Sequence, residues 1–132
     1  MVIVDSDVWS EAFRRKIGEA SWQAKRLAEL IESEDVQMIG SIRQEVLSGI
    51  REAARFSEIR DALRSFEDLP IRREIHEVAA SYFNICRAHG VQGTHTDFLI
   101  CACAKSWGMR ILSKDRDYTH FARHIPVAIE QE

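Results

Sequence analysis

Acidic residues follow two of the apolar runs in this chain, where their type and spacing could support chemistry at a divalent metal ion. Asp5 ends the run Met1–Val4, and Asp115 comes shortly after the run Met109–Leu112, with Asp117 two residues further on. Carboxylate oxygens are the ligands that Mg²⁺ and Mn²⁺ prefer in proteins. An ion held in this way can activate a water molecule and polarise a phosphate. The residue types therefore favour metal-assisted hydrolysis of phosphodiester bonds.

Two further acids could reach the same place. Asp97 is expected near the start of a helix, where the preceding loop could present it to the carboxyl ends of the strands. Glu45 lies four residues after Ser41 in another predicted helix and can point toward the beginning of that helix. Carboxylates brought together without basic partners would repel one another, and a divalent ion removes that penalty.

Each of these acids also has a purely structural interpretation. Asp5 could be only a helix cap, and Glu45 could be a solvated surface residue. Asp97 could be a first-turn residue favoured by the helix dipole, while Asp115 and Asp117 could be ordinary turn residues. Composition and spacing do not decide between these interpretations.

Short apolar runs alternate with amphipathic stretches along the chain, which indicates an α/β sandwich with a mainly parallel central sheet. The predicted strands are Met1–Val4, Val36–Ile39, Met109–Leu112 and Val127–Ile129. Helices are predicted after a cap at Ser6 or Asp7, over about 20–32, from a capping box at 41–44, over about 52–66 and 72–89, from Thr94 or Thr96 to Gly108, and over about 118–123.

Size and composition fit one globular domain over residues 1–132, with 45% hydrophobic and 30% charged residues. The net charge of −3 argues against tight, indiscriminate nucleic-acid binding, which depends on a strong positive field. It allows a nuclease, because catalytic carboxylates contribute negative charge that a bound metal offsets.

The compartment is expected to be the cytoplasm. No apolar run approaches the roughly 20 residues that span a bilayer, and the chain starts without the basic leader of a signal peptide. Its cysteines, Cys86, Cys101 and Cys103, are odd in number and lie in apolar segments. We therefore expect buried, reduced thiols and no disulfide framework or zinc site.

Four segments around the acids resemble, in order, the acidic motifs of PIN-domain proteins. These segments are Val2–Trp9, Gln44–Ile50, Thr96–Ala102 and Leu112–Tyr118. Each motif is weak alone, but their ordered occurrence from residue 2 to residue 118 is specific. Within the family, the chain is most similar to the toxins of VapBC-type toxin–antitoxin pairs. The resemblance implies a three-layer α/β/α sandwich and endonucleolytic cleavage of RNA with Mg²⁺ or Mn²⁺. It also implies a homodimer held by a small antitoxin.

The resemblance also assigns roles by position. It implies that the catalytic acids are Asp5, Glu45, Asp97 and Asp115, and that the metal contacts are Asp5, Asp97, Asp115 and Asp117. It places supporting hydroxyls at Ser6 and Ser113, although Thr is more usual at the second position.

Two residues depart from the family pattern. Phe98 follows Asp97 where a small residue is common, so the wall of the groove could differ. Asp7 adds a carboxylate where Ser or Asn is frequent, and we interpret it as a helix cap in preference to a member of the site.

Basic residues near the motifs could contact the RNA backbone, since phosphate contacts from Lys and Arg position a substrate. The candidates beside the acids are Arg43, Lys114 and Arg116. The run Arg14-Arg15-Lys16 could do the same, but it fits a solvated helix end better.

Two other functions stay open on the sequence. Asp5-Ser6-Asp7 superficially resembles the nucleophile motif of haloacid-dehalogenase-like phosphohydrolases, in which Asp5 would attack phosphate and Asp7 would act as acid and base. The chain could also be a non-catalytic PIN module that binds RNA or a protein.

Overall fold

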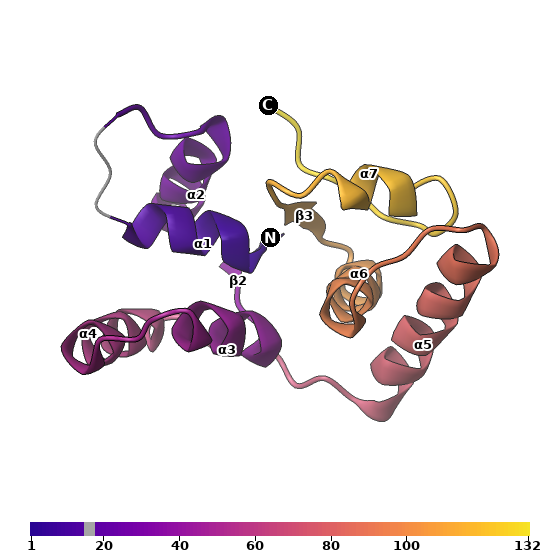
Figure 1. The fold of residues 1–132 in the computed structure, drawn as a ribbon, viewed down its shortest axis with the longest axis horizontal. Coiled ribbons are helices and arrows are strands. Elements are labelled where there is room, and N and C mark those ends of the chain that lie inside the picture. Colours follow the sequence, from indigo (N-terminus) through magenta and orange to yellow (C-terminus); the bar gives the residue numbers. More distant parts are fainter. Residues whose placement is uncertain (15–17) are drawn as a thin grey trace.

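The fold is an α/β sandwich built on a small parallel sheet, described by a computed structural model over residues 1–14 and 18–132. Arg15 and Lys16, from the basic run noted above, lie outside these ranges. The elements, labelled in Figure 1, are β1 (Val2–Val4), α1 (Ser6–Phe13), α2 (Trp22–Glu32), β2 (Val36–Gln37), α3 (Gly40–Ser48), α4 (Ala53–Leu63), α5 (Arg73–Ala88), α6 (His95–Trp107), β3 (Arg110–Leu112) and α7 (Asp117–Phe121).

The sheet has the strand order β2-β1-β3, with β1 at its centre. Val2 pairs with Val36 on one side and with Arg110 on the other, and both pairings are parallel. The chain leaves β1 first toward one edge and later returns to the other, so right-handed crossovers place helices on opposite faces. Helices α1 and α2 lie apart from α5 and α6 in Figure 1, with the strands between them. The predicted three-layer sandwich is confirmed.

Local sequence explains where the helices begin and end. The Asp5 side chain caps α1 by accepting a hydrogen bond from the Ser6 N–H. Thr94 caps α6 through a full capping box with Asp97. Gly108 ends the same helix in the left-handed conformation, at φ 65°, which glycine adopts without a steric penalty.

Two sequence-based expectations are wrong in detail. The capping box predicted at Ser41 does not form, because α3 already begins at Gly40 with Ile39 as its cap, and the Ser41 hydroxyl is buried. The predicted strand Val127–Ile129 is reduced to a single bridge between Ile111 and Ile129. Pro126 precedes this segment, and a one-residue contact is too short for a strand.

The core lies where the helices meet the sheet. Its largest fully buried side chains include Trp9, Phe98, Tyr118 and Phe121, and Phe98 packs on Phe121 with ring centroids 4.7 Å apart. The three cysteines are buried and free, as expected. Among the described residues, none of the helices has the length and apolar character needed to cross a membrane.

Candidate active site

Asp5 lies at the centre of the candidate site, at the carboxyl end of β1. Its backbone N–H donates to the Leu112 carbonyl at 2.9 Å, which continues the pairing of β1 with β3. The Ser113 hydroxyl donates to Asp5 Oδ2 at 2.9 Å, and the Ser6 N–H donates to Oδ1 at 2.8 Å. Only 7% of Asp5 is exposed. The carboxylate is therefore fixed in orientation and largely removed from water.

Burial, the charge of Asp7 and, to a smaller extent, the charge of Asp97 together raise the pKa of Asp5 to about 7. The hydrogen bonds from Ser113 and Ser6 act in the opposite direction. Burial and the neighbouring carboxylates make Asp5 hard to ionise. A bound cation would stabilise its charged form.

Asp7 belongs to this cluster, and its interpretation as a helix cap is wrong, because Asp5 occupies the cap position. Asp7 Oδ2 instead accepts the Lys114 N–H at 3.1 Å and lies 3.4 Å from the Ser113 hydroxyl. Its Oδ1 is buried without a hydrogen-bond partner among the described residues. Burial raises the pKa of Asp7, and the charge of Asp115 adds to that effect.

Asp97 and Glu45 reach the same neighbourhood from α6 and α3. Asp97 Oδ2 accepts the Thr94 N–H at 2.9 Å, so this residue closes the start of α6 as well as facing the other acids. Glu45 is exposed at the edge of the site. Its pKa is raised by partial burial and by the charges of Asp97 and Asp7. Both residues are thus close enough for their charges to interact with the Asp5 cluster.

Asp115 and Asp117 lie in the turn that follows β3. The Asp115 N–H donates to the Ser113 hydroxyl at 3.0 Å, and Asp115 Oδ1 accepts the Asp117 N–H at 2.9 Å. Both side chains are exposed. Asp115 interacts electrostatically with Asp7, whereas the link from Asp117 to the site is its backbone contact with Asp115. Both therefore serve as turn residues, and Asp115 also faces the cluster.

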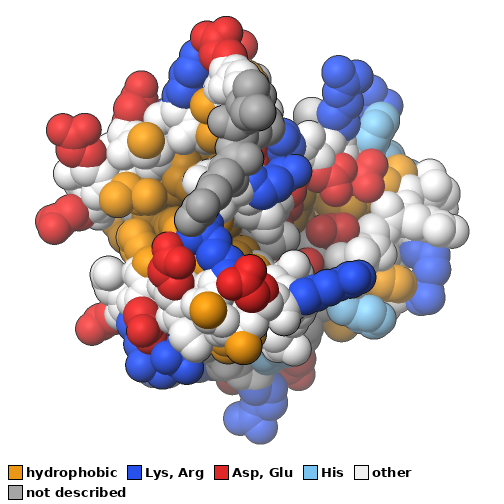
Figure 2. Space-filling view, turned by 60° about the vertical axis from the view of Figure 1, so that its left-hand side comes forward, with side chains coloured by type: hydrophobic (Ala, Val, Ile, Leu, Met, Phe, Trp, Pro, Cys, Tyr) orange, Lys and Arg blue, Asp and Glu red, His pale blue; other side chains and the backbone are white. Residues whose placement is uncertain are grey.

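The cluster fits a hard divalent cation in its chemistry. Carboxylate oxygens are suitable donors, and the buried, unpartnered Asp7 Oδ1 lacks the positive partner that a buried charge needs. Across residues 1–14 and 18–132, no three His, Cys, Asp or Glu side chains already form a group that could hold a metal ion. The acids are neighbours whose charges interact. Figure 2 shows acidic side chains around a recess on this face, with basic side chains beside them.

Two of the basic candidates are engaged within the protein. Arg43 donates to Asp68 and to the carbonyls of Leu63 and Phe66, so its guanidinium joins α3 to the segment after α4. Lys114 forms an ion pair with Glu11 at 2.9 Å. Arg116 is exposed beside the acids. RNA contact by these residues stays a prediction.

Sequence reasoning missed Glu11 and Tyr118. Glu11 is 3% exposed on α1, and its place four residues after Asp7 was the available signal that both lie on one face of the helix. Tyr118 is buried with an unpartnered hydroxyl among the described residues, and its pKa is raised well above the ordinary value by burial and by the charges of Asp5 and Asp97.

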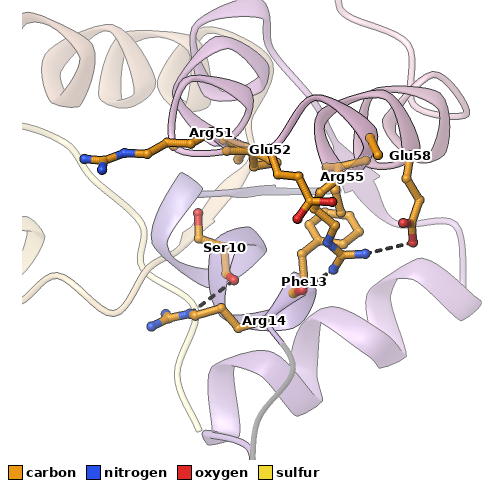
Figure 3. A pocket seen from close by; sticks show the side chains of 12 residues that line it. Ser10, Phe13, Arg14, Arg51, Glu52, Arg55 and Glu58 are labelled. Carbon is orange, nitrogen blue, oxygen red and sulfur yellow. Dashed lines mark hydrogen bonds and ion pairs between the residues drawn. The ribbon is translucent and has the colours of Figure 1, made fainter.

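A cavity of about 700 Å³ opens between α1 and the α3–α4 region, and none of the clustered acids lines it. Figure 3 shows Phe13 in its wall and the side chains of Arg14, Arg51 and Arg55 around it. Arg55 is held by Glu58 at 2.8 Å and by the Phe13 carbonyl. The cavity thus has an apolar wall bordered by arginines, and it is lined by residues of α1 and α3, the helices that carry Asp7 and Glu45.

Comparison with known proteins gives one family and a set of similar folds. The family model described as the PIN domain matches residues 2–124. The crystal structure of FitAcB from Neisseria gonorrhoeae superposes with a TM-score of 0.75 and 19% identity, covering 99% of this chain and 97% of that one. The structure of FitAB bound to the IR36 DNA fragment gives a TM-score of 0.73 and 20% identity, covering 98% and 94%. Identities this low show likeness of fold alone. No curated protein matches in sequence.

Proposed function

Because the chain belongs to the PIN-domain family, we propose that it is a metal-dependent endoribonuclease that hydrolyses RNA phosphodiester bonds at the acidic cluster around Asp5. The observation that carries this proposal is the environment of Asp5. It is buried at the end of the central strand, its pKa is raised to about 7, and the charges of Asp7 and Asp97 contribute to that rise. Repulsion between these carboxylates destabilises the site, and a bound cation would remove that repulsion.

The proposed ligands of Mg²⁺ or Mn²⁺ are Asp5, Asp97 and Asp115, joined by Asp7, with Asp117 as a more distant contact. A bound ion would supply an activated water molecule and would stabilise the charge that develops on the phosphate. The choice of carboxylates over nitrogen or sulfur ligands favours these two ions over zinc.

The chain's own residues prepare the site. Ser113 and Ser6 hold the two oxygens of Asp5 in place, so that the carboxylate is oriented before substrate arrives. Glu45 lies exposed at the edge of the site, and its pKa is raised. We therefore propose that it accepts a proton from the attacking water. Arg116 is exposed next to Asp115 and is proposed to contact a phosphate of the RNA.

Separate substitutions of the acids test the site. We expect Asp5→Asn and Asp97→Asn to lower cleavage of a mixed RNA substrate with Mn²⁺ by about 100-fold or more, because each removes a charged ligand from the ion. Asp61→Asn on α4, whose carboxylate is an exposed partner of Arg60, is the matched control and should cut like the parent.

The same assay separates the other functions. Full activity of both Asp5→Asn and Asp97→Asn would overturn the assignment of the site. A parent that binds RNA without cutting it would be a non-catalytic module. Turnover of a phosphomonoester with labelled phosphate on Asp5 would indicate a phosphohydrolase.

We further propose that the chain is the toxin of a toxin–antitoxin pair, acts in the cytoplasm as a homodimer and is held by a small protein antitoxin. The likeness to FitAcB and to FitAB bound to DNA supports this partner. The cavity beside Phe13 suits a segment with apolar side chains and carboxylates, which would meet Arg14 and Arg51.

Expression in a bacterial host tests the toxin proposal. The parent should arrest growth, Asp5→Asn should not, and the product of the adjacent gene should copurify with the chain and restore growth. Light scattering of the purified Asp5→Asn chain should give the mass of a dimer. Growth unaffected by an RNA-cleaving parent would remove the toxin role while leaving the nuclease.

A further inference from the structure

We propose that Lys114 and Glu11 are positioning residues, whose ion pair holds the turn after β3 against α1 and thereby places Ser113 and Asp115 relative to Asp5. This inference rests on the proposed nuclease function, and it gives Lys114 a role different from the RNA contact expected from the sequence.

Lys114 is attached to α1 at two points. Its backbone N–H donates to Asp7 Oδ2 at 3.1 Å, and its Nζ lies 2.9 Å from Glu11 Oε1. Asp7 and Glu11 are four residues apart, so they lie one above the other on the same face of the helix. Main chain and side chain of one residue are therefore bound to successive turns of α1.

Glu11 is a fixed point for this attachment. Its side chain is 1% exposed. Oε1 accepts the Ser21 hydroxyl at 2.6 Å, and Oε2 accepts the Ser21 N–H at 3.0 Å, where Ser21 caps α2. A buried carboxylate held by several donors cannot follow a moving partner. This distinguishes the pair from an ordinary surface ion pair, which contributes little.

The residues on either side of Lys114 belong to the site. Ser113 donates to Asp5 Oδ2 and accepts the Asp115 N–H, at 2.9 and 3.0 Å. The turn lies between the end of β3 at Leu112 and the start of α7 at Asp117. A displacement of Lys114 would consequently move the hydroxyl that orients Asp5 and the carboxylate of Asp115 together. The consequence should be weaker metal binding and slower chemistry.

The predicted RNA contact makes a different demand on Lys114. A lysine that neutralises a phosphate contributes to RNA affinity and to its salt dependence, and it does so independently of Glu11. A positioning lysine acts through Glu11, so removing either partner should weaken metal binding and removing both should add little to the larger single effect.

The experiment compares Lys114→Met, Glu11→Gln, the double variant and Lys114→Arg with the parent. The readouts are kcat and KM on an RNA oligonucleotide, Mn²⁺ affinity from electron paramagnetic resonance titration without RNA, and thermal unfolding. The control is Lys25→Met, which removes the exposed pair between Lys25 and Glu19.

We expect Lys114→Met and Glu11→Gln each to weaken Mn²⁺ binding and to lower kcat by about 10- to 100-fold, the range found when groups behind a metal ligand are removed. KM should stay within about twofold of the parent value. The double variant should match the more affected single variant, and Lys114→Arg should recover most of the loss. The Lys25→Met control should equal the parent in every readout.

Three results would overturn the proposal: a higher KM with a reduced salt dependence and unchanged kcat, effects of the two substitutions that add, or Mn²⁺ affinity equal to that of the parent. If Lys114→Met does not fold, the double variant decides, because it removes the buried charge of Glu11 together with that of Lys114. Failure of the nuclease proposal is recognised separately, as a parent that binds Mn²⁺ without cutting RNA. The Mn²⁺ affinities then still decide the positioning role.

Discussion

The Ser113 hydroxyl donates a hydrogen bond to Asp5 Oδ2 at 2.9 Å and joins residues that are 108 positions apart in the sequence. The contact forms because β1 and β3 are parallel neighbours, so their carboxyl ends meet at the same edge of the sheet. It stabilises the charged form of a carboxyl group that burial and neighbouring charges disfavour. This bond is therefore where the fold acts most directly on the chemistry of the site.

Ser113→Ala should raise the pKa of Asp5 above its value of about 7, since it removes a bond that lowers the pKa. A rise of about one unit would reduce the ionised fraction several-fold below neutral pH. Carbon-13 NMR titration of the Asp5 carboxyl group in metal-free protein measures this change. Ser113→Thr keeps the hydroxyl and should titrate like the parent. An unchanged midpoint in Ser113→Ala would show that the hydrogen bond has no influence on Asp5.

Stability should depend on pH through Asp5 in the metal-free protein. The folded-state pKa is about 7, against an ordinary aspartate value of 3.8. Between these values the folded chain binds more protons than the unfolded chain, so the free energy of unfolding falls as pH rises. The loss attributable to Asp5 is of order 4 kcal/mol across this window, and it is complete above about pH 7.

Urea unfolding with a chelator at pH 5 and pH 8 measures the part of this loss that falls above pH 5, about 3 kcal/mol. Asp5→Asn is the reference because an amide does not titrate. The parent should lose more stability than Asp5→Asn between the two pH values, and Mg²⁺ should restore stability mainly at pH 8. Parallel pH curves for the two proteins would contradict the raised pKa.

The order of the elements and the place of Asp5 were predictable, while the arrangement of the other charges was not. Apolar runs that end in acids indicated β1 and β3, and the parallel sheet then brought Asp5 and Ser113 together. Thr94 and Gly108 marked the ends of α6 because caps are local features. Local rules thus sufficed at both ends of α6, although they failed at Ser41, where the predicted capping box does not form.

Distant partners explain the failures. The sequence predicted that Asp7 caps α1. In the structure Asp5 is the cap, and Asp7 instead accepts the N–H of Lys114 in the turn after β3. The sequence predicted that Arg43 is available to contact RNA. In the structure its guanidinium is bound to Asp68 and to two backbone carbonyls at and after the end of α4. Glu11 drew no prediction from the sequence, and it is 3% exposed because Ser21 and Lys114 cover it. The environment of each of these residues is set by contacts with residues that are distant in the sequence.

Asp7→Asn should lower the pKa of Asp5, because the charge of Asp7 is the second cause of its rise. The pKa should stay above 3.8, since burial is the first cause. The same NMR titration gives the midpoint, and Asp61→Asn on α4 is the control that should leave it unchanged. If Asp5 titrates identically in Asp7→Asn and in the parent, the two carboxylates do not interact and Asp7 is no member of the cluster.

Gly93→Ala should destabilise the fold by about 1–3 kcal/mol, the range for overpacking a well-packed interior. A Cβ atom at this position would lie 2.6 Å from the Phe121 ring and 2.9 Å from the Phe98 ring, which are packed on each other. Relief requires one ring or the backbone next to Thr94 to move, and Thr94 begins the helix that carries Asp97. We therefore expect Mn²⁺ affinity to fall together with the free energy of unfolding measured in urea.

The matched control is Gly40→Ala, where the nearest atom to an added Cβ is Asp68 Oδ2 at 3.8 Å, an ordinary contact. It lies at the start of α3, where alanine favours the helix over glycine, so stability should be equal or slightly higher. If Gly93→Ala unfolds at the same urea concentration as the parent, the rings have room to separate. The close approach of Gly93 would then have no part in holding the start of α6 in place.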